Sequence, residues 1–177
     1  RFGPNEGEKT VVELATLLEG DSPIQDDLDL TPSYTTDVLV IGGGGAGCAA
    51  ALHAHGAGAK VILATKLRLG DSNSVMAQGG MQISVAPEDS PVTHFIDTLK
   101  GGHMHNDHDL LKVMVEEGPS IAKWLIELGV LFDRQADGNL HVKKGGGSSK
   151  PRLVTCSDYT GLEIMRVLKD EVLNQKI

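Results

Sequence analysis

One segment constrains the fold of this chain more than any other: a glycine-rich turn, Gly42 to Gly47, that directly follows a short apolar run. That run, Asp37 to Ile41, has the length of a strand, and its continuous apolar character is expected of a strand buried on both faces. We expect a helix of small residues from Cys48 to His55 and a second buried strand from Lys60 to Thr65. Together these segments predict a βαβ unit of about 30 residues with parallel strands.

The glycines of the turn match the G-x-G-x-x-G fingerprint of dinucleotide-binding proteins at Gly42, Gly44 and Gly47. The first allows a tight turn, the second lets backbone approach a pyrophosphate, and the third lets the helix pack close to the strand. A tight turn in an unrelated α/β domain is the alternative. The fingerprint also expects an acidic residue after the second strand. Thr65 and Lys66 stand there, which disfavours an ordinary NAD site and leaves NADP or a differently held FAD.

Charge and cysteine content exclude several classes of protein. The formal net charge of −8 argues against nucleic acid as a partner, and residues 1–34 carry eight of the acids and only two bases. We interpret residues 1–35 as an acidic N-terminal extension. No apolar run approaches the ~20 residues of a membrane-spanning helix, and the start of the chain carries no signal segment. Two cysteines, Cys48 and Cys156, predict no disulfide framework and favour a reduced cytosolic setting.

Three further helices are expected after residue 83. Asp109–Glu117 and Ser120–Leu128 are predicted as separate helices, because Gly118-Pro119 should end the first and open the second. Gly129 should close the second helix in a left-handed conformation. The last helix should run from about Leu162 to Leu173.

Two stretches are expected to lack helices. Residues 66–83 are polar and rich in glycine, with no helical period. Residues 130–158 should form short strands and loops around Asp137-Gly138 and Gly145 to Gly147.

The segment Ser72 to Gly80 (Ser-Asn-Ser-Val-Met-Ala-Gln-Gly-Gly) makes a family resemblance specific. From Asp37 to Gly80 the chain resembles the N-terminal FAD-binding region of the flavoprotein subunits of succinate dehydrogenase and fumarate reductase, and of L-aspartate oxidase. The matching pieces are the turn at 42–47, Thr65-Lys66, Ala77–Gly80, Asp97-Thr98, Asp107, Asp109, Trp124–Asp133, Gly145–Ser149, Arg152 and Asp158–Gly161. The resemblance covers about residues 36–175.

This resemblance implies an α/β fold: a Rossmann-like FAD-binding βαβ unit with a parallel sheet and an appended helical and loop subdomain. Residues 36–177 would be the FAD-binding domain, as an incomplete portion of a larger flavoprotein. Residues 42–47 would hold the pyrophosphate, residues 65–76 would wrap the adenosine and ribityl portions, and residues 77–80 would lie against the isoalloxazine ring. The implied cofactor-binding residues are Gly42, Gly44, Gly45, Ala46, Gly47, Thr65, Lys66, Ser72, Asn73, Ser74, Met76, Ala77, Gln78, Gly79 and Gly80.

Backbone N–H groups of residues 77–80, aimed at the flavin N1 region, would stabilise the reduced anion. An ordinary polar loop is the alternative interpretation of residues 70–80. In many respiratory members the residue after the serine is a histidine bonded covalently to FAD, whereas Asn73 stands here. The resemblance therefore implies non-covalent FAD, and it favours fumarate reduction or amino-acid oxidation over succinate oxidation.

Two polar clusters have alternative interpretations. A metal site could be suggested by the cluster of His103, His105, His108, Asp107 and Asp109. Capping of the next helix by Asn106 or Asp107 is favoured instead, and no metal is expected. A basic, flexible patch is expected from Lys143, Lys144, Lys150 and Arg152. It could contact FAD phosphate or a dicarboxylate, or it could be a solvated loop.

The implied reaction is hydride exchange between flavin N5 and the C2–C3 bond of a dicarboxylate. No catalytic residue is assigned, because the substrate-binding His and Arg and the proton-donating Arg of the resembling subunits would lie beyond Ile177. L-aspartate oxidase is one alternative, although Gly147 to Lys150 lacks a histidine expected there in that enzyme. The other is a non-catalytic nucleotide-binding or electron-transfer module. An iron–sulfur or other electron-transfer subunit is the implied partner, and the expected location is cytoplasmic or, through partner subunits, at the inner face of a membrane.

Overall fold

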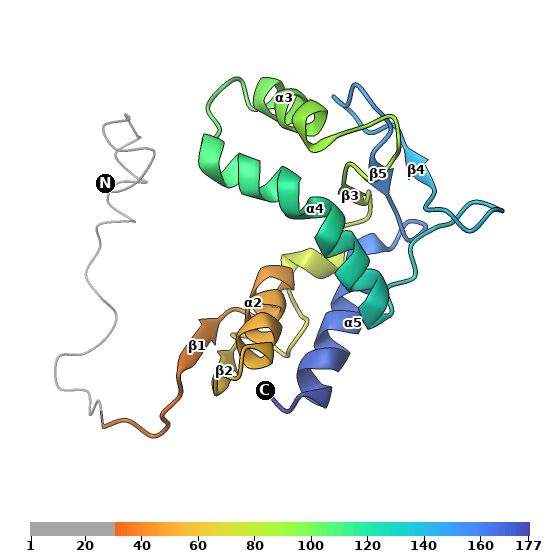
Figure 1. Cartoon of the computed structure of the whole chain (residues 1–177). Coiled ribbons are helices and arrows are strands. Elements are labelled where there is room, and N and C mark those ends of the chain that lie inside the picture. The colour runs from red at the N-terminus through yellow and green to blue at the C-terminus, as the bar shows by residue number, and fades with distance from the viewer. Residues whose placement is uncertain (1–30) are drawn as a thin grey trace, which may run out of the picture. The chain divides into compact units, whose positions relative to one another are not determined.

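A computed structural model describes residues 31–177 of the chain, and residues 36–177 form one compact unit (Figure 1). The acidic extension expected over residues 1–35 lies almost wholly outside the described residues, so that interpretation stays a prediction.

The predicted βαβ unit is present. Strand β1 (Val38–Ile41) pairs in parallel with β2 (Val61–Ala64), with Val38 opposite Val61. Helix α2 (Gly45–Gly56) connects them and packs on both strands. The helix begins three residues earlier than expected, because Gly44 takes the N-cap position and the glycines of the turn themselves enter the first helical turn. The parallel pair confirms the predicted α/β class.

The expectation that β1 is buried on both faces is wrong for this structure. Leu39 is 57% exposed and Ile41 is 83% exposed, while Val38 and Val40 between them are half-buried. Side chains of a strand alternate between its two faces. Helix α2 contacts β1, and β2 is the one strand that pairs with β1 within residues 31–177. Alternate side chains of β1 therefore stay uncovered.

Helix α3 (Pro91–Gly101) was not predicted. It begins with a recognisable signal, since the Ser90 hydroxyl accepts a hydrogen bond from the N–H of Thr93 (3.1 Å) and Pro91 occupies the first turn. Proline is favoured there because its missing N–H would have no intrahelical partner.

Helix α4 (His108–Leu128) is continuous where two helices were expected. Pro119 lies inside it, and the helix bends along its length (Figure 1). Gly118 lacks the Cβ that would clash with the proline ring, and the Ser120 hydroxyl donates to the carbonyl of Glu117 at 2.7 Å. The buried face of the helix continues on both sides of the proline, through Leu111, Val115, Ala122 and Leu125. Burial of this stripe outweighs the loss of one backbone hydrogen bond.

Both ends of α4 follow the predictions. The Asp107 carboxylate accepts from the N–H groups of Asp109 and Leu110, each at 3.0 Å, and thereby caps the helix start. Gly129 closes the helix with a φ of 108°, the predicted left-handed conformation.

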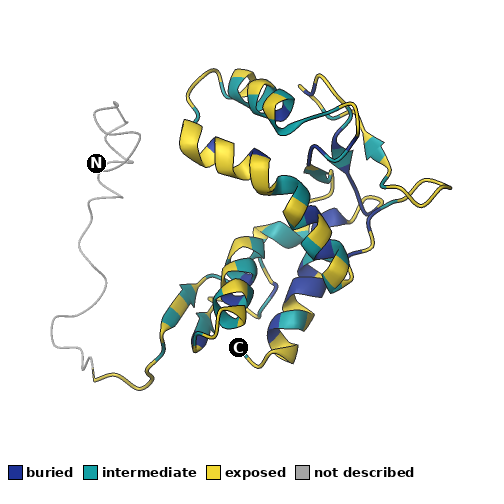
Figure 2. Cartoon of the chain, in the orientation of Figure 1, coloured by how far each residue is buried: buried dark blue, intermediate teal, exposed yellow. Residues whose placement is uncertain are grey.

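A second, antiparallel sheet has the strand order β3–β5–β4, from β3 (Met81–Gln82), β5 (Leu153–Val154) and β4 (Val142–Lys143). The stretch 66–83, expected to lack helical character, contains the short 3₁₀ helix η1 (Asn73–Met76). Helix α5 (Thr160–Asn174) contains the predicted last helix and packs on η1, α2 and α4. Figure 2 shows buried residues along α5 and a first half of α4 that is largely exposed. The buried residues of α4 are Leu111 and Val115 before Pro119, and Ala122 and Leu125 after it.

Candidate functional site

The glycine-rich turn brings the end of β1 against the start of α2. A Cβ at Gly47 would overlap the carbonyl oxygen of Gly42, so only glycine permits this approach. Gly42 has a φ of 118°, a left-handed conformation that side chains other than glycine rarely adopt. These two positions therefore satisfy the conformational roles predicted for them.

Serines of the η1 region lie directly beside the turn. The N–H of Gly45 donates to the Ser74 hydroxyl at 3.2 Å. A Cβ at Gly44 would lie 3.3 Å from Ser74 Oγ and 3.4 Å from Ser72 Oγ. The Ser72 hydroxyl is itself buried and has no hydrogen-bond partner among residues 31–177. The first N–H groups of a helix lack intrahelical partners, so donors and hydroxyls converge at this point.

Thr65 also adjoins the turn, since a Cβ at Gly43 would lie 3.0 Å from Thr65 Oγ1. Lys66, in contrast, is exposed. The end of β2 and the η1 region therefore meet at the glycine-rich turn, although they are separate in the sequence.

The loop Ala77–Gly80 is attached to the start of α5. The N–H of Gly161 donates to the carbonyl of Ala77 at 2.7 Å, and the Thr160 hydroxyl donates to the carbonyl of Gln78 at 3.3 Å. Thr160 and Gly161 belong to the matching motif Asp158–Gly161, and the sequence indicates no individual role for either residue. No local pattern could have found these contacts, because they join positions more than 80 residues apart.

Several predicted site residues of this region are open to solvent. Met76 is 76% exposed, and Asn73, Ala77, Gln78 and Gly79 are also exposed. Gly80 is half-buried, with a φ of 104° and a position too close to the carbonyl of Val154 for any side chain. The loop therefore has one face fixed against protein and one face open.

An apolar cavity of about 320 Å³ lies between α2, η1, α4 and α5. Gly45 and Ser74 line it at the turn, and Trp124, Ile164 and Leu168 line it from the long helices. The His53 ring, on α2, lies 4.8 Å from the ring of Trp124. His53 is nevertheless exposed.

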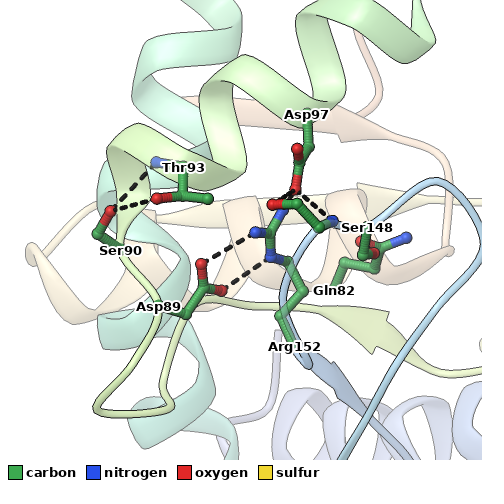
Figure 3. Close-up of polar contacts among 8 residues, drawn as sticks. Gln82, Asp89, Ser90, Thr93, Asp97, Ser148 and Arg152 are labelled. Carbon is green, nitrogen blue, oxygen red and sulfur yellow. Dashed lines mark hydrogen bonds and ion pairs between the residues drawn. The ribbon is translucent and has the colours of Figure 1, made fainter.

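Arg152 does not belong to the predicted basic, flexible patch. Its side chain is fully buried, and Nε and Nη2 donate to the two carboxylate oxygens of Asp89 at 2.8 and 2.9 Å (Figure 3). Nη1 lies 2.9 Å from Asp97 Oδ2 as an ion pair without hydrogen-bond geometry. Asp97 also accepts from the N–H and hydroxyl of Ser149, both at 2.8 Å. Arg152 therefore joins β5 to α3 and is not available to a phosphate or a dicarboxylate.

The pKa values of two titratable groups at this cluster, His94 and Asp97, differ from their usual values. Burial lowers the pKa of His94, and the positive charge of Arg152 lowers it further. Burial raises the pKa of Asp97, but the bonds from Ser149 and the charge of Arg152 outweigh it, so the net pKa lies below its usual value.

Lys143, another member of the predicted patch, is also engaged. Its Nζ donates to Thr155 Oγ1 at 3.0 Å and lies 3.5 Å from Asp133 Oδ2. The Thr155 hydroxyl donates to Asp133 at 2.5 Å, and this bond is the main reason that the pKa of Asp133 is lowered. Lys144 and Lys150 remain exposed.

The histidines at 103, 105 and 108 do not form a ligand set with the acidic residues around them. In the part of the chain that the structure describes, no group of three or more His, Cys, Asp or Glu side chains is placed to hold a metal ion. None of the helices between residues 31 and 177 is both long and apolar enough to cross a bilayer.

Comparison with known proteins gives a consistent result. Residues 37–177 match the family described as FAD binding domain. A fumarate reductase (CoM/CoB) subunit from Methanothermobacter marburgensis is 40% identical over 148 residues, covering 81% of this chain and 27% of that protein. L-aspartate oxidase of Streptomyces coelicolor is 38% identical over 141 residues, covering 79% of this chain and 24% of that protein.

A solved structure agrees in fold. Mycobacterium smegmatis Sdh1 in complex with UQ1 superposes with a TM-score of 0.77 at 38% identity, covering 80% of this chain and 24% of that chain. The chain thus spans about a quarter of the length of the proteins it matches.

Proposed function

Because this chain belongs to the FAD binding domain family and FAD is its cofactor, we propose that it forms the FAD-binding part of a fumarate reductase- or succinate dehydrogenase-like oxidoreductase. Bound FAD supplies hydride exchange at flavin N5. The proposed partner in that exchange is the C2–C3 bond of a dicarboxylate substrate.

The observation that carries the proposal is the convergence at the glycine-rich turn. Backbone donors of the first turn of α2 and the Ser72 hydroxyl, which has no partner among the described residues, come together there. Gly44 leaves the space beside the Ser72 and Ser74 hydroxyls free of a side chain, which suits the close approach of a pyrophosphate, and Gly47 lets the helix start lie against Gly42. We propose residues 42–47 as the pyrophosphate site and Thr65, Lys66 and residues 72–76 as the residues around the adenosine and ribityl portions.

The loop Ala77–Gly80 is the proposed contact for the isoalloxazine ring. Its open face, together with the absence of side chains at Gly79 and Gly80, suits a flat ring. Asn73 is the proposed reason for non-covalent binding, because a side-chain amide does not provide the nucleophilic nitrogen of a histidine.

L-aspartate oxidase activity, in which hydride is taken from a C–N bond, is the second candidate. The specific observation in its favour is that the L-aspartate oxidase of Streptomyces coelicolor is nearly as similar to this chain as the fumarate reductase relative is, with 38% against 40% identity. A non-catalytic nucleotide-binding or electron-transfer module is the third.

An iron–sulfur or other electron-transfer subunit is the proposed protein partner, with the chain at the inner face of a membrane through such subunits. The similarity to a chain of a succinate dehydrogenase complex supports this arrangement.

The bound chromophore tests the cofactor site. The purified protein should show a flavin absorption spectrum, and acid precipitation should release intact FAD into the supernatant. Colour that stays with the precipitate would refute non-covalent binding, and a colourless protein that binds NADP but not FAD would refute the flavoprotein function.

The flavoprotein containing these residues should then be assayed with reduced dye and fumarate, and with aspartate and oxygen. Activity in the first assay supports the main proposal, activity in the second supports L-aspartate oxidase, and activity in neither supports a non-catalytic module.

A further inference from the structure

The start of α5 holds two successive carbonyl groups of the loop Ala77–Gly80. Gly161 donates its N–H to the carbonyl of Ala77 at 2.7 Å, and the Thr160 hydroxyl donates to the carbonyl of Gln78 at 3.3 Å. Thr160 is 1% exposed, so water cannot take the place of its hydroxyl as the donor to Gln78.

The two α5 residues are suited to this contact. A Cβ at Gly161 would overlap the carbonyl oxygen of Ser74 and would lie 2.8 Å from that of Ala77, so glycine is required for the helix to come this close. The Thr160 hydroxyl accepts from the N–H of Cys156 at 3.0 Å. A hydroxyl has one proton to donate, and with its acceptor side occupied by Cys156 that proton is directed at Gln78.

Fixing the two carbonyls also fixes the two N–H groups that follow them. None of the peptide bonds in residues 31–177 is cis, and in a trans peptide the N–H points opposite to the C=O. Both carbonyls face adjacent groups at the start of α5, so the N–H groups of Gln78 and Gly79 both point away from α5. Neither N–H has a hydrogen-bond acceptor among residues 31–177, and both residues are exposed.

We propose that Thr160 and Gly161 are positioning residues, which orient the N–H groups of Gln78 and Gly79 as a pair of donors for the negative charge of reduced flavin. Two successive backbone N–H groups on one side make an anion-binding concavity, and donors that are already oriented need no rearrangement when charge develops. This inference rests on the proposed function, since it takes the flavin ring to lie on the open face of the loop.

The test compares three variants of the FAD-loaded protein. Thr160→Val keeps the shape of the side chain but removes the hydroxyl, and Thr160→Ser keeps the hydroxyl. Thr155→Val is the matched control, because Thr155 is similarly buried (4% exposed) but its hydroxyl bonds to Asp133 and not to the loop. Thr160→Val should weaken binding of reduced relative to oxidised FAD by about tenfold, which lowers the two-electron midpoint potential by about 30 mV. Thr160→Ser and Thr155→Val should keep the potential of the wild type.

An unchanged potential in Thr160→Val, or an equal shift in Thr155→Val, would overturn the inference while the protein still binds FAD and the proposed function stands. A wild-type protein that binds no FAD would instead overturn the proposed function. If Thr160→Val does not fold, hydrogen exchange on the wild type decides the question. The amides of Gln78 and Gly79 should exchange at least tenfold more slowly with reduced FAD than without it, and unchanged exchange would refute the donor pair.

Discussion

Replacing Arg152 by methionine should destabilise the protein far more than the same replacement at a surface arginine. Arg152 is fully buried and neutralises Asp89, whose side chain is also fully buried, and Asp97, whose side chain is 14% exposed. Removing one partner of a buried ion pair leaves an uncompensated buried charge and costs about 3–5 kcal/mol. Here two carboxylates would lose their partner, so we expect a loss in the upper part of that range.

Arg166 provides the matched control, because it also pairs with two acidic side chains, Glu163 at 2.9 Å and Asp170 at 3.7 Å. Its side chain is 50% exposed, and exposed pairs contribute about 0–1 kcal/mol. Urea unfolding can be followed through the fluorescence of Trp124, the single tryptophan of the chain. With a slope of about 1–3 kcal/mol per molar urea, Arg152→Met should lower the midpoint by about 1 M or more. A shift no larger than that of Arg166→Met would refute the view that this ion cluster holds β5 against α3.

Two other predictions concern the turn and acid stability. Gly47→Ala should weaken FAD binding at least tenfold, measured by flavin fluorescence titration, because the new Cβ overlaps the carbonyl of Gly42. Gly56→Ala, at the open end of the same helix, should bind FAD like the wild type, and equal losses in both variants would contradict this reasoning. The bond from Thr155 holds the pKa of Asp133 below its usual value, so Asp133 stabilises the fold above the unfolded pKa of about 3.9, and this contribution is lost as the pH falls through the folded pKa. The free energy of unfolding, measured with urea, should therefore decrease less between pH 7 and pH 3 for Asp133→Asn than for the wild type. An equal decrease in both proteins would exclude this contribution.

Local sequence patterns predicted the elements whose residues interact with near neighbours. The Asp107 cap and the left-handed Gly129 are of this kind, because each depends on residues a few positions apart. The βαβ unit pairs strands that lie farther apart in the sequence, but its apolar runs and glycine spacing are local patterns. Pro119 shows the limit of such reasoning. Its local preference is to start a helix, but the buried stripe of α4 on both sides of it keeps one helix continuous.

The candidate site shows the same division. The turn at 42–47 could be predicted from its glycine spacing alone. The attachment of residues 77–78 to Thr160 and Gly161 could not, because it is a contact between distant segments. Arg152 was assigned to a flexible patch for the same reason, since neighbouring lysines do not reveal partners at Asp89 and Asp97, more than 50 positions away.

The continuity of α4 has a mechanical consequence. At 1.5 Å per residue, its 21 residues extend about 31 Å, and they contact α3 as well as α5. The residues that α4 contributes to the cavity wall, Ile121, Trp124 and Leu125, all follow Pro119. The helix that contacts α3 therefore also forms part of the wall of the cavity beside the glycine-rich turn. Pro119 is the position at which α4 bends most easily. Proline has no N–H to donate to the preceding turn, so bending costs less there than elsewhere along the helix.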